Sequence, residues 1–487
     1  MTTTLAAATE PRSFWVAGRA AAGERAVAVR HPYDGHLVAR VGIPTAEQVD
    51  RAVRAAESAA AGFAELPAHV RADALDHVAR RLVEQRDDLA WLIVEESGKP
   101  LQWARAEVAR AASTFRWAGE EARRWAGELQ RLDTDPAGVG RLGLVRRFPR
   151  GPVLAIAPFN FPLNLVAHKV APALAVGASV IVKPAPRTPL SALALGALLA
   201  ECDLPAGTWS VLPLDNDATA ALVRDPRLPV VSFTGSGPVG WGIRDAVPRK
   251  HVTLELGGNA AVVVCPDWSS DADLDRAAER IATFATYQAG QSCISVQRVL
   301  VDRRLYPALL ERLVAVVEAQ VTGDPHDPLT HVGPLIDEAA ARRVHGWVGD
   351  AVAAGATVAA GGTLDGCTMA PTVLVGVPAD ADVAREEVFG PVVLVDPVDD
   401  LDEAFARVND SRYGLQAGVF THDLETAFRA HRALDVGGVV IGDVPSYRAD
   451  QMPYGGAKES GVGREGVRYA MADYTYERVL VLTGLDL

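Results

Sequence analysis

One of the four cysteines of this chain stands in a context that favours reactivity. Cys293 lies within Gln288-Ala-Gly-Gln-Ser-Cys-Ile-Ser-Val-Gln-Arg298, and Glu255 lies 38 residues upstream within Val252-Thr-Leu-Glu-Leu-Gly-Gly-Asn259. A thiol can attack an electrophilic carbon, and a carboxylate can activate the water that releases the captured group. The pair therefore indicates a covalent reaction that is completed by hydrolysis.

The other cysteines, Cys202, Cys265 and Cys367, lie far apart and form no C-x-x-C pair. We interpret them as small buried hydrophobic residues. Neither a disulfide framework nor a thiolate metal site is expected, and no metal ligands are predicted from the sequence. This cysteine usage favours the reducing cytoplasm.

The bulk properties are those of a globular protein with two or three domains. The chain has 487 residues, of which 49% are hydrophobic and 22% charged. Its formal charge of 48 − 61 = −13 argues against nucleic acid or an anionic membrane as partner. The N-terminal apolar stretch is too short for a secretory signal. The apolar run 165–182 is interrupted by His168, Lys169, Pro172 and Gly177, which predicts a buried helix and a strand rather than a membrane span.

The elements that must position these residues alternate along the chain. Residues 45–127 show helical spacing of apolar positions, and a hairpin is predicted at 130–150. Strands at 153–157, 179–182, 209–212, 230–233 and 252–256 are separated by helices, which predicts a doubly wound parallel sheet. A second α/β pattern begins near residue 257, with strands at 260–265 and near 299, 392 and 439. A last strand is predicted at 478–482.

A glycine motif allows a different interpretation of Glu255. Gly235-Ser-Gly-Pro-Val-Gly240 matches G-x-G-x-x-G, and Glu255 follows 20 residues later, where dinucleotide folds place a ribose-binding acid. Against this interpretation, the motif follows about the fourth strand of its sheet, whereas the dinucleotide motif belongs to the first. The N-terminus of the helix after the motif can still attract a phosphate group.

Seven motifs together resemble the aldehyde dehydrogenase superfamily, in that family's order. They are Ala157-Pro-Phe-Asn-Phe-Pro162, Ile181-Val-Lys-Pro184, Phe233-Thr-Gly-Ser236, Leu254-Glu-Leu-Gly-Gly258, Gly290-Gln-Ser-Cys293, Glu386-Glu-Val-Phe-Gly-Pro391 and Pro453-Tyr-Gly-Gly-Ala-Lys-Glu-Ser-Gly461. The resemblance implies an α/β fold with two doubly wound parallel-sheet domains and a small β oligomerisation domain. It implies a nucleotide-binding domain (1–129 and 151–256), a catalytic domain (257–455), and an oligomerisation hairpin and terminal strand (130–150 and 470–487). A homodimer or homotetramer is expected.

The resemblance also implies roles for individual residues. Cys293 would be the nucleophile, Glu255 the general base, and Asn160 the oxyanion donor. An alternative is that Asn160 caps the following helix. For the cofactor, the implied residues are Lys183, Gly235, Ser236, Glu387 and Phe389.

The loop after Lys183 departs from the family pattern. Members that prefer NAD usually carry Glu three residues after this lysine, but this chain has Pro186 followed by Arg187. Without the carboxylate a 2′-phosphate is not repelled, and Arg187 could attract it. NADP or dual use is therefore favoured over NAD alone. The alternative is that Arg187 is solvated and Pro186 only shapes the loop.

The expected substrate pocket contains several polar residues. Its positions are Asn164, Leu165, His168, Ile294, Ser295, Tyr447 and Arg448. The loop 442–450 resembles the lactaldehyde and phosphonate-aldehyde dehydrogenase branch, except that Gly442 stands where that branch has Asn. We expect a small, polar or anionic aldehyde held by Arg448 or His168. Alternatively, Arg448 pairs with an acid such as Asp443 or Asp450.

The function that these residues predict is NAD(P)-dependent oxidation of an aldehyde to the carboxylic acid. An alternative within enzymes is a CoA-acylating dehydrogenase, which needs no water-activating base. An alternative of another class is a catalytically silent binding or scaffold protein. The set of Asn160, Glu255 and Cys293 speaks against both.

Overall fold

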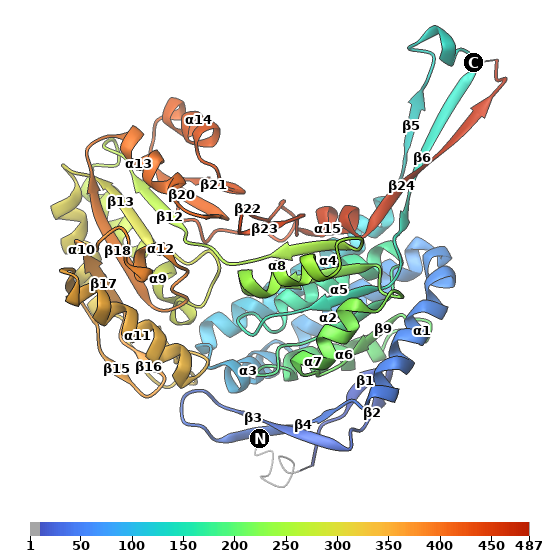
Figure 1. Cartoon of the computed structure of the whole chain (residues 1–487), viewed down its shortest axis with the longest axis horizontal. Helices are drawn as coiled ribbons and strands as arrows, with labels where there is room; N and C mark the ends of the chain where they lie inside the picture. The colour runs from blue at the N-terminus through green and yellow to red at the C-terminus, as the bar shows by residue number, and fades with distance from the viewer. Residues whose placement is uncertain (1–9, 487) are drawn as a thin grey trace.

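The computed structural model describes residues 10–486 of the protein, so most of the N-terminal apolar stretch lies outside the described residues. Figure 1 shows two lobes, joined by segments that run between them, and an arm that projects from one lobe. Each lobe is built around a largely parallel sheet flanked by helices, and the arm is a separate β unit. The predicted α/β fold class is confirmed.

The region predicted to be helical, residues 45–127, forms four helices in succession. They are α1 (Ala46–Glu65), α2 (Ala68–Glu84), α3 (Arg86–Ser97) and α4 (Leu101–Arg124). Thr45 begins α1 with a capping box, because its hydroxyl accepts from the Gln48 N–H while the Gln48 side chain accepts from the Thr45 N–H. Gly98 ends α3 in a left-handed conformation (φ 68°). Pro67 and Pro100 stand directly before α2 and α4, positions where a missing N–H costs no helical hydrogen bond.

The sheet of the first lobe has the strand order β2-β1-β9-β8-β7-β10-β11-β23. Its strands are β1 (Phe14–Val16), β2 (Arg19–Ala21), β7 (Val153–Ile156), β8 (Val180–Lys183), β9 (Trp209–Val211), β10 (Val230–Thr234), β11 (His251–Glu255) and β23 (Gly461–Val462). The strands from β7 to β11 are parallel and are connected by α5 (Asn164–Val176), α6 (Leu190–Ala200), α7 (Asn216–Arg224) and α8 (Gly237–Ala246). The order reverses between β7 and β10, which is where open α/β sheets bind ligands.

Two features of this lobe were not predicted. The sheet is not purely parallel, because β1 and β23 pair antiparallel with its edges. Strands also precede residue 45, where none was predicted: besides β1 and β2, β3 (Arg25–Arg30) and β4 (Leu37–Ile43) form a hairpin. The sequence of β3 does not alternate between apolar and polar residues, which is the pattern by which a half-buried strand is recognised. Most of its residues are exposed.

The sheet of the second lobe has the order β14-β17-β18-β13-β12-β20-β21. Its strands are β12 (Ala261–Val264), β13 (Arg298–Asp302), β14 (Thr357–Ala360), β17 (Thr372–Val375), β18 (Val392–Val398), β20 (Gln416–Phe420) and β21 (Gly438–Ile441). Its helices are α9 (Asp271–Thr286), α10 (Tyr306–Glu318), α11 (Glu338–Ala353), α12 (Asp382–Arg385), α13 (Leu401–Asn409) and α14 (Leu424–Ala433). The chain changes sheets between Glu255 and Ala261. The domain limits given above stay a prediction, and one of them falls at this change of sheet.

The arm contains the hairpin predicted at 130–150 and the last strand of the chain. Strands β5 (Glu128–Arg131) and β6 (Arg141–Pro149), joined through the short helix η2 (Pro136–Gly138), pair with β24 (Thr475–Thr483) in the order β24-β6-β5. The arm extends well beyond the body of its lobe (Figure 1). Segments from the first third and from the end of the chain thus form one small sheet.

The long apolar run 165–182 folds as predicted, into α5 followed by β8. Helix α5 is buried along its whole length against α4 and the sheet. Among residues 10–486, no helix is long and apolar enough to cross a membrane. The remaining short elements are η3 (Tyr287–Gly290), β15 (Leu364–Asp365), β16 (Thr368–Met369), β19 (Tyr413–Gly414), β22 (Ala457–Lys458) and α15 (Val467–Asp473).

Candidate active site

Cys293 follows a tightly constrained loop between α9 and β13. Gln288 and Ala289 have left-handed backbone angles (φ 51° and 54°), and Gly290 follows with φ 70°. A Cβ atom on Gly290 would lie 2.0 Å from the Gly390 carbonyl oxygen, so only glycine fits there. Two non-glycine residues in the left-handed region store local strain, which is frequent at functional sites. The loop therefore holds Cys293 in a fixed place.

The thiol of Cys293 is enclosed by neighbouring side chains. Its Sγ lies 2.9 Å from the Tyr454 hydroxyl oxygen, and Ile294, Leu415 and Tyr454 form a small apolar cluster against it. Burial raises the pKa of Cys293 to about 12, although the hydrogen bond with Tyr454 acts in the opposite direction. At pH 7 the thiol is therefore protonated in this state.

Glu255 ends strand β11 and is 3% exposed. Among the described residues, neither of its carboxylate oxygens has a hydrogen-bond partner. Burial, together with the nearby charge of Glu465, raises the pKa of Glu255 well above its ordinary value. The charge of Glu255 also raises the pKa of Cys293, so the two groups are within electrostatic reach. This proximity favours a role for Glu255 beside the thiol over a role in binding ribose.

Asn160 follows β7 at the same edge of the first sheet. Its side-chain amide donates to the Gln291 carbonyl oxygen at 3.0 Å, and the Gln288 side chain donates to the Asn160 carbonyl oxygen. Helix α5 begins four residues later, with Leu163 as its N-cap. The interpretation of Asn160 as a helix cap is therefore wrong. The amide carries a second N–H that can serve another acceptor.

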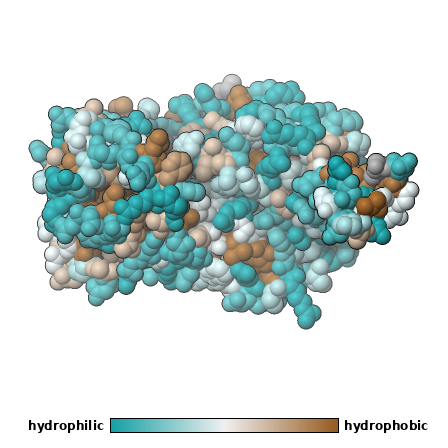
Figure 2. All heavy atoms as spheres, turned by 90° about the horizontal axis from the view of Figure 1, so that it is seen from above, coloured by the Kyte–Doolittle hydropathy of each residue, from teal (hydrophilic) through white to brown (hydrophobic). Residues whose placement is uncertain are grey.

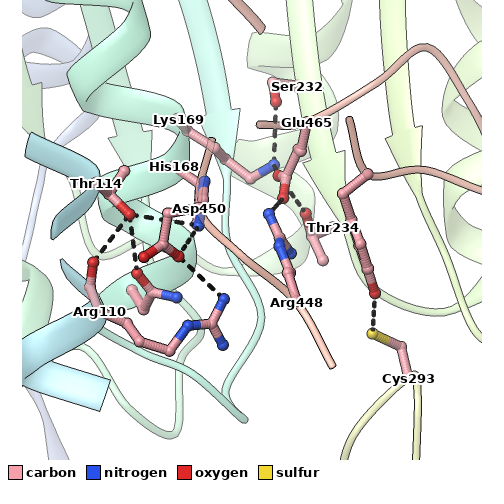
Figure 3. Close-up of polar contacts among 12 residues, drawn as sticks. Arg110, Thr114, His168, Lys169, Ser232, Thr234, Cys293, Arg448, Asp450 and Glu465 are labelled. Atoms are coloured by element: carbon pink, nitrogen blue, oxygen red, sulfur yellow. Dashed lines mark hydrogen bonds and ion pairs between the residues drawn. The ribbon is translucent and has the colours of Figure 1, made fainter. Parts of the chain in front are cut away.

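A buried ionic cluster adjoins Glu255, and its central residue, Glu465, was not predicted from the sequence. This carboxylate accepts from Lys169 Nζ at 3.1 Å and from the Arg448 guanidinium at 3.0 Å, and Lys169 also contacts the Ser232 hydroxyl at 3.0 Å (Figure 3). Although burial opposes it, the charges of Lys169 and Arg448 lower the pKa of Glu465 to about 2. Glu465 lies outside the seven motifs, and the sequence carried no signal that would select it.

A second polar cluster surrounds Asp450, on the side of α4 and α5. Asp450 Oδ1 lies 3.2 Å from His168 Nε2 and 3.1 Å from an Arg110 nitrogen. The Thr114 hydroxyl lies 3.4 Å from both His168 Nε2 and Asn164 Oδ1, as Figure 3 shows for the labelled members. Burial, with the charge of Arg448, lowers the pKa of His168 to about 4. A neutral imidazole that already contacts Asp450 is a weak anchor for an anion.

The structure separates the remaining predicted pocket residues. Leu165 is buried on α5, and Ile294 packs beside the thiol. The Ser295 hydroxyl donates to the Phe284 and Ala285 carbonyl oxygens of α9, so it is directed toward that helix. Tyr447 is 53% exposed.

Arg448 pairs with an acid, as the alternative interpretation proposed, but the acid is neither Asp443 nor Asp450. Its partner is Glu465, whereas Asp443 pairs with Arg280 and Asp450 with Arg110. The Arg448 guanidinium carbon also lies 3.8 Å from the centre of the Tyr454 ring. Arg448 is therefore close to the tyrosine that contacts the thiol.

The residues predicted to bind the cofactor lie at the carboxyl ends of the strands. Lys183 ends β8; it is 5% exposed, and burial lowers its pKa to about 8 against the opposing charge of Asp215. Ser236 is the N-cap of α8, and a Cβ on Gly235 would lie 2.6 Å from the Phe233 ring. A cationic amine and the free N–H groups of a helix N-terminus suit the phosphates of a dinucleotide.

On the side of the second lobe, Glu387 is close to the chain that links the two sheets. Its carboxylate accepts from the Gly258 N–H at 3.1 Å, and a Cβ on Gly257 would lie 2.4 Å from it. Burial raises the pKa of Glu387 to about 7. Phe389 (φ 50°) meets Phe159 edge to face, with ring centres 5.8 Å apart. A carboxylate that accepts hydroxyl hydrogens, beside an aromatic ring, suits a ribose and its attached base.

The loop that bears on cofactor choice is exposed. Arg187 has 64% of its side chain exposed and pairs with Asp337 at 3.0 Å. Pro186 helps to line an open cavity of about 280 Å³, together with Pro189, Pro213 and Asp215. Arg187 is therefore solvated here and would have to exchange Asp337 for a phosphate in order to bind one.

Comparison with known proteins gives a consistent result over the chain. The model of the family described as "Aldehyde dehydrogenase family" matches residues 15–480. The 3-sulfolactaldehyde dehydrogenase of Priestia aryabhattai is 41% identical, over 93% of this chain and 94% of that protein.

Two solved structures extend this comparison to three dimensions. Aldehyde dehydrogenase 21 from Physcomitrella patens, in complex with the reaction product succinate, has a TM-score of 0.96 and 42% identity, covering 98% of this chain and 100% of its own. The NADP-dependent glyceraldehyde-3-phosphate dehydrogenase from Bacillus halodurans C-125, complexed with NADP, has a TM-score of 0.93 and 33% identity, with coverage of 98% and 100%. These similarities do not favour the CoA-acylating or scaffold alternatives.

Proposed function

Because this chain belongs to the aldehyde dehydrogenase family, we propose that it oxidises a small anionic aldehyde to the carboxylic acid through a thioester on Cys293, with NAD or NADP as hydride acceptor. The observation that carries this proposal is the convergence of three groups from separate elements. A thiol, a buried carboxylate without a hydrogen-bond partner among the described residues, and a fixed amide come together where the two sheets meet.

Cys293 supplies the nucleophile. Because its raised pKa keeps the thiol protonated at pH 7, the proton must leave before or as the sulfur attacks the aldehyde carbon. Glu255 has a raised pKa and a carboxylate with no competing partner among the described residues, so it is suited to take this proton. The new C–S bond leaves a negative charge on the former carbonyl oxygen.

Asn160 stabilises that charge. Its bond to the Gln291 carbonyl oxygen fixes the amide, so its second N–H is presented without further reorganisation. Loss of one such donor typically costs about 2.7–4 kcal/mol of transition-state stabilisation. Lys183, Ser236 and Glu387 would hold the dinucleotide. When bound, it supplies the acceptor for the hydride that leaves the thiohemiacetal carbon.

After the thiol proton has passed from Glu255 to solvent, the carboxylate completes the cycle as a general base. It removes a proton from water, the water oxygen adds to the thioester carbonyl carbon, and Asn160 again holds the oxygen. The C–S bond then breaks, which releases the acid and returns Cys293. A water-activating carboxylate in this position makes CoA unnecessary as acyl acceptor.

The substrate class follows from the charges beside the thiol. Arg448 is the cation within electrostatic reach of the thiol among the described residues. Arg110 and Lys169 lie farther along the same polar region, paired with Asp450 and Glu465, respectively. The buried Nε atoms of Arg110 and Arg448 have no hydrogen-bond partner among the described residues, and a buried donor of this kind favours an acceptor. A carboxylate, sulfonate or phosphate on the aldehyde would supply one. The 3-sulfolactaldehyde dehydrogenase and the dehydrogenase in complex with succinate support this choice.

We also propose a homodimer or homotetramer in the cytoplasm. The arm presents apolar side chains of β24 to solvent, with Val479 and Leu480 more than half exposed, and hydrophobic surface is visible on the arm at the right of Figure 2. Strand β24 is an edge strand of its sheet and can pair with another subunit. All four cysteines are free thiols, in agreement with a reducing compartment.

The experiment that tests the proposed reaction is a spectrophotometric assay of nicotinamide reduction by the purified protein. Aldehydes bearing a carboxylate, sulfonate or phosphate are compared with neutral aldehydes of equal length, with NAD and NADP in parallel and with or without CoA. Turnover without CoA that is concentrated on the anionic aldehydes is expected. Turnover that requires CoA, or equal rates for neutral and anionic aldehydes, would contradict the proposal.

A further inference from the structure

Three histidines from two distant parts of the chain meet near the turn between β3 and β4. His31 and His36 flank the turn between β3 and β4, and His326 lies in the loop after α10. The His31 ring centre is 4.9 Å from that of His36 and 5.0 Å from that of His326. Glu95, in the last turn of α3, lies among them. The proposed function uses none of these residues.

His31 is the buried member, with 2% exposure. Its Nδ1 lies 2.9 Å from the backbone carbonyl oxygen of Glu95. Because a carbonyl oxygen only accepts, Nδ1 carries the hydrogen, and Nε2 is left with a lone pair. Among the described residues, this Nε2 has no hydrogen-bond partner. A buried ring nitrogen in this condition requires an explanation, since buried polar atoms are nearly always satisfied.

His36 and His326 are oriented in the same way as His31. Their Nδ1 atoms lie 2.6 Å and 2.8 Å from carboxylate oxygens of Asp34 and Asp324, respectively. Their Nε2 atoms lie 2.8 Å and 3.2 Å from the two oxygens of Glu95. Histidines that bind metals typically donate their other ring N–H to a carboxylate or a backbone carbonyl, which fixes the tautomer. All three rings have such an acceptor on Nδ1.

We propose that His31, His36, His326 and Glu95 form a binding site for a divalent transition-metal cation, with zinc as the metal that fits best. Imidazole nitrogens with one carboxylate are ordinary zinc ligands, usually four in number. Ligand atoms of His31 and His326, with an oxygen of Asp324, lie within 4.8 Å of one another. The Glu95 carboxylate lies 2.8 Å from His36 Nε2 and 3.2 Å from His326 Nε2, so binding of one ion by all four ligands would require His36 and Glu95 to move toward His31. Asp34 and Asp324 act as the orienting acceptors.

The alternative is an ion-pair cluster in which His36 and His326 are protonated and donate to Glu95. The pKa values agree with this state in the absence of metal. Although burial opposes it, the hydrogen bonds from His326 and His36 lower the pKa of Glu95 to about 2. The pKa values of His36 and His326 are both raised. The ion-pair cluster leaves the Nε2 of His31 unexplained, because neither neighbouring ring has a further hydrogen to donate to it. A metal ion would displace the protons on His36 and His326 and bind the lone pair of His31 as well.

A metal ion bound at this site would link the first lobe to the second. The β3–β4 turn and α3 belong to the first lobe, whereas the loop of His326 continues to Ile336, whose N–H donates to the Gln291 side chain at 2.9 Å. Gln291 is two residues from Cys293, and its carbonyl oxygen accepts from Asn160. Bound metal would therefore stabilise the loop that leads to the catalytic cysteine, and it would raise the unfolding temperature.

The test is zinc binding by the full-length protein, freed of any affinity tag and stripped with a chelator. Titration calorimetry with zinc is carried out in a Cys293→Ser background, so that the thiol does not compete. One zinc per chain is expected. Asp324→Asn should weaken binding about 10- to 100-fold, and His31→Ala should weaken it more. His345→Ala, at an exposed histidine on α11, is the matched control and should have no effect.

Two further measurements keep the result interpretable. Circular dichroism of each variant without zinc shows whether it is folded; if His31→Ala is not, Asp324→Asn, whose aspartate side chain is 52% exposed, decides the question. The zinc X-ray absorption spectrum should show nitrogen and oxygen ligands. Zinc affinity that is equal in His31→Ala, Asp324→Asn and His345→Ala would overturn the proposal, and so would a spectrum with sulfur ligands.

Discussion

Cys293 illustrates how burial changes a reactive side chain. In the sequence it is a cysteine between polar residues, whereas in the structure it is enclosed by Ile294, Leu415 and Tyr454. Its thiol is kept neutral, and the carboxyl of Glu255 is shifted toward its protonated form for the same reason. The two groups that we propose to carry the chemistry are thus both shifted toward their protonated forms in this structure.

The pH dependence of alkylation tests the state of this thiol. With a pKa raised to about 12, the thiolate fraction of Cys293 should rise about tenfold for each pH unit between pH 7 and 9. The rate of inactivation by iodoacetamide without substrate should rise in parallel. Cys293→Ser serves as the blank for the other three thiols. A rate that is constant from pH 6 upward would show that the thiolate already exists at neutral pH.

Arg110 is suited to a test of selectivity for anionic aldehydes, because its side chain is less buried than that of Arg448. Arg110→Met should lower kcat/KM for anionic aldehydes about 10- to 100-fold, which corresponds to about 1.5–3 kcal/mol for a charged hydrogen bond. Neutral aldehydes should be affected little. Arg116→Met on the same helix, at an exposed arginine paired with Glu120, is the control. An equal loss for neutral and anionic aldehydes would remove Arg110 from substrate recognition.

At the scale of elements, prediction from sequence succeeded where periodicity was strong. The helices of residues 45–127 and the parallel strands β7 to β11 were predicted, because a buried helix face and fully apolar strands leave clear patterns. The strands before residue 45 were not predicted. Most of β3 is exposed, so its conformation depends on pairing with β4 rather than on a local pattern. The antiparallel pairing of β23 with β11 could not be predicted either, because it joins segments about 200 residues apart.

The loop after β8 carries the prediction on cofactor choice. Pro186→Glu restores a carboxylate where NAD-preferring relatives are expected to have one, so it should repel a 2′-phosphate and accept from a ribose hydroxyl. The ratio of kcat/KM for NADP to that for NAD should fall at least about tenfold, equivalent to about 1.4 kcal/mol. Steady-state kinetics with both cofactors measure this. An unchanged ratio would mean that the side chain at 186 does not face the ribose.

The whole molecule brings together residues that the sequence keeps far apart. Motifs indicated Cys293, Glu255 and Asn160 as site residues, because each lies in a short, distinctive stretch, and their roles stay a prediction. The Lys169–Glu465 pair was not predicted, since 296 residues separate its members and neither has a distinctive local context. The His31–His326 contact was missed for the same reason. Contacts of this kind depend on how distant segments of the chain fold together, and no local pattern encodes that.

The arm exposes apolar side chains through which we propose that it contacts another subunit. Changing Leu480 and Leu482 together to Lys should separate the subunits, because it places charges on the exposed edge strand β24. Sedimentation velocity should then report monomers in place of dimers or tetramers. Leu424→Lys, at a 74% exposed leucine of α14, is the control. A wild-type protein that sediments as a monomer would contradict the assignment of the arm.

The central claim, a thioester on Cys293 that Glu255 releases, is tested most directly by intact-protein mass spectrometry of the Glu255→Gln variant. Mixed with NAD or NADP and a preferred anionic aldehyde, this variant should reduce about one cofactor per subunit and then stall. Its mass should increase by that of the acyl group, and peptide mapping should place the group on Cys293. Steady turnover by the variant with no acyl adduct, or an adduct on another residue, would contradict the mechanism.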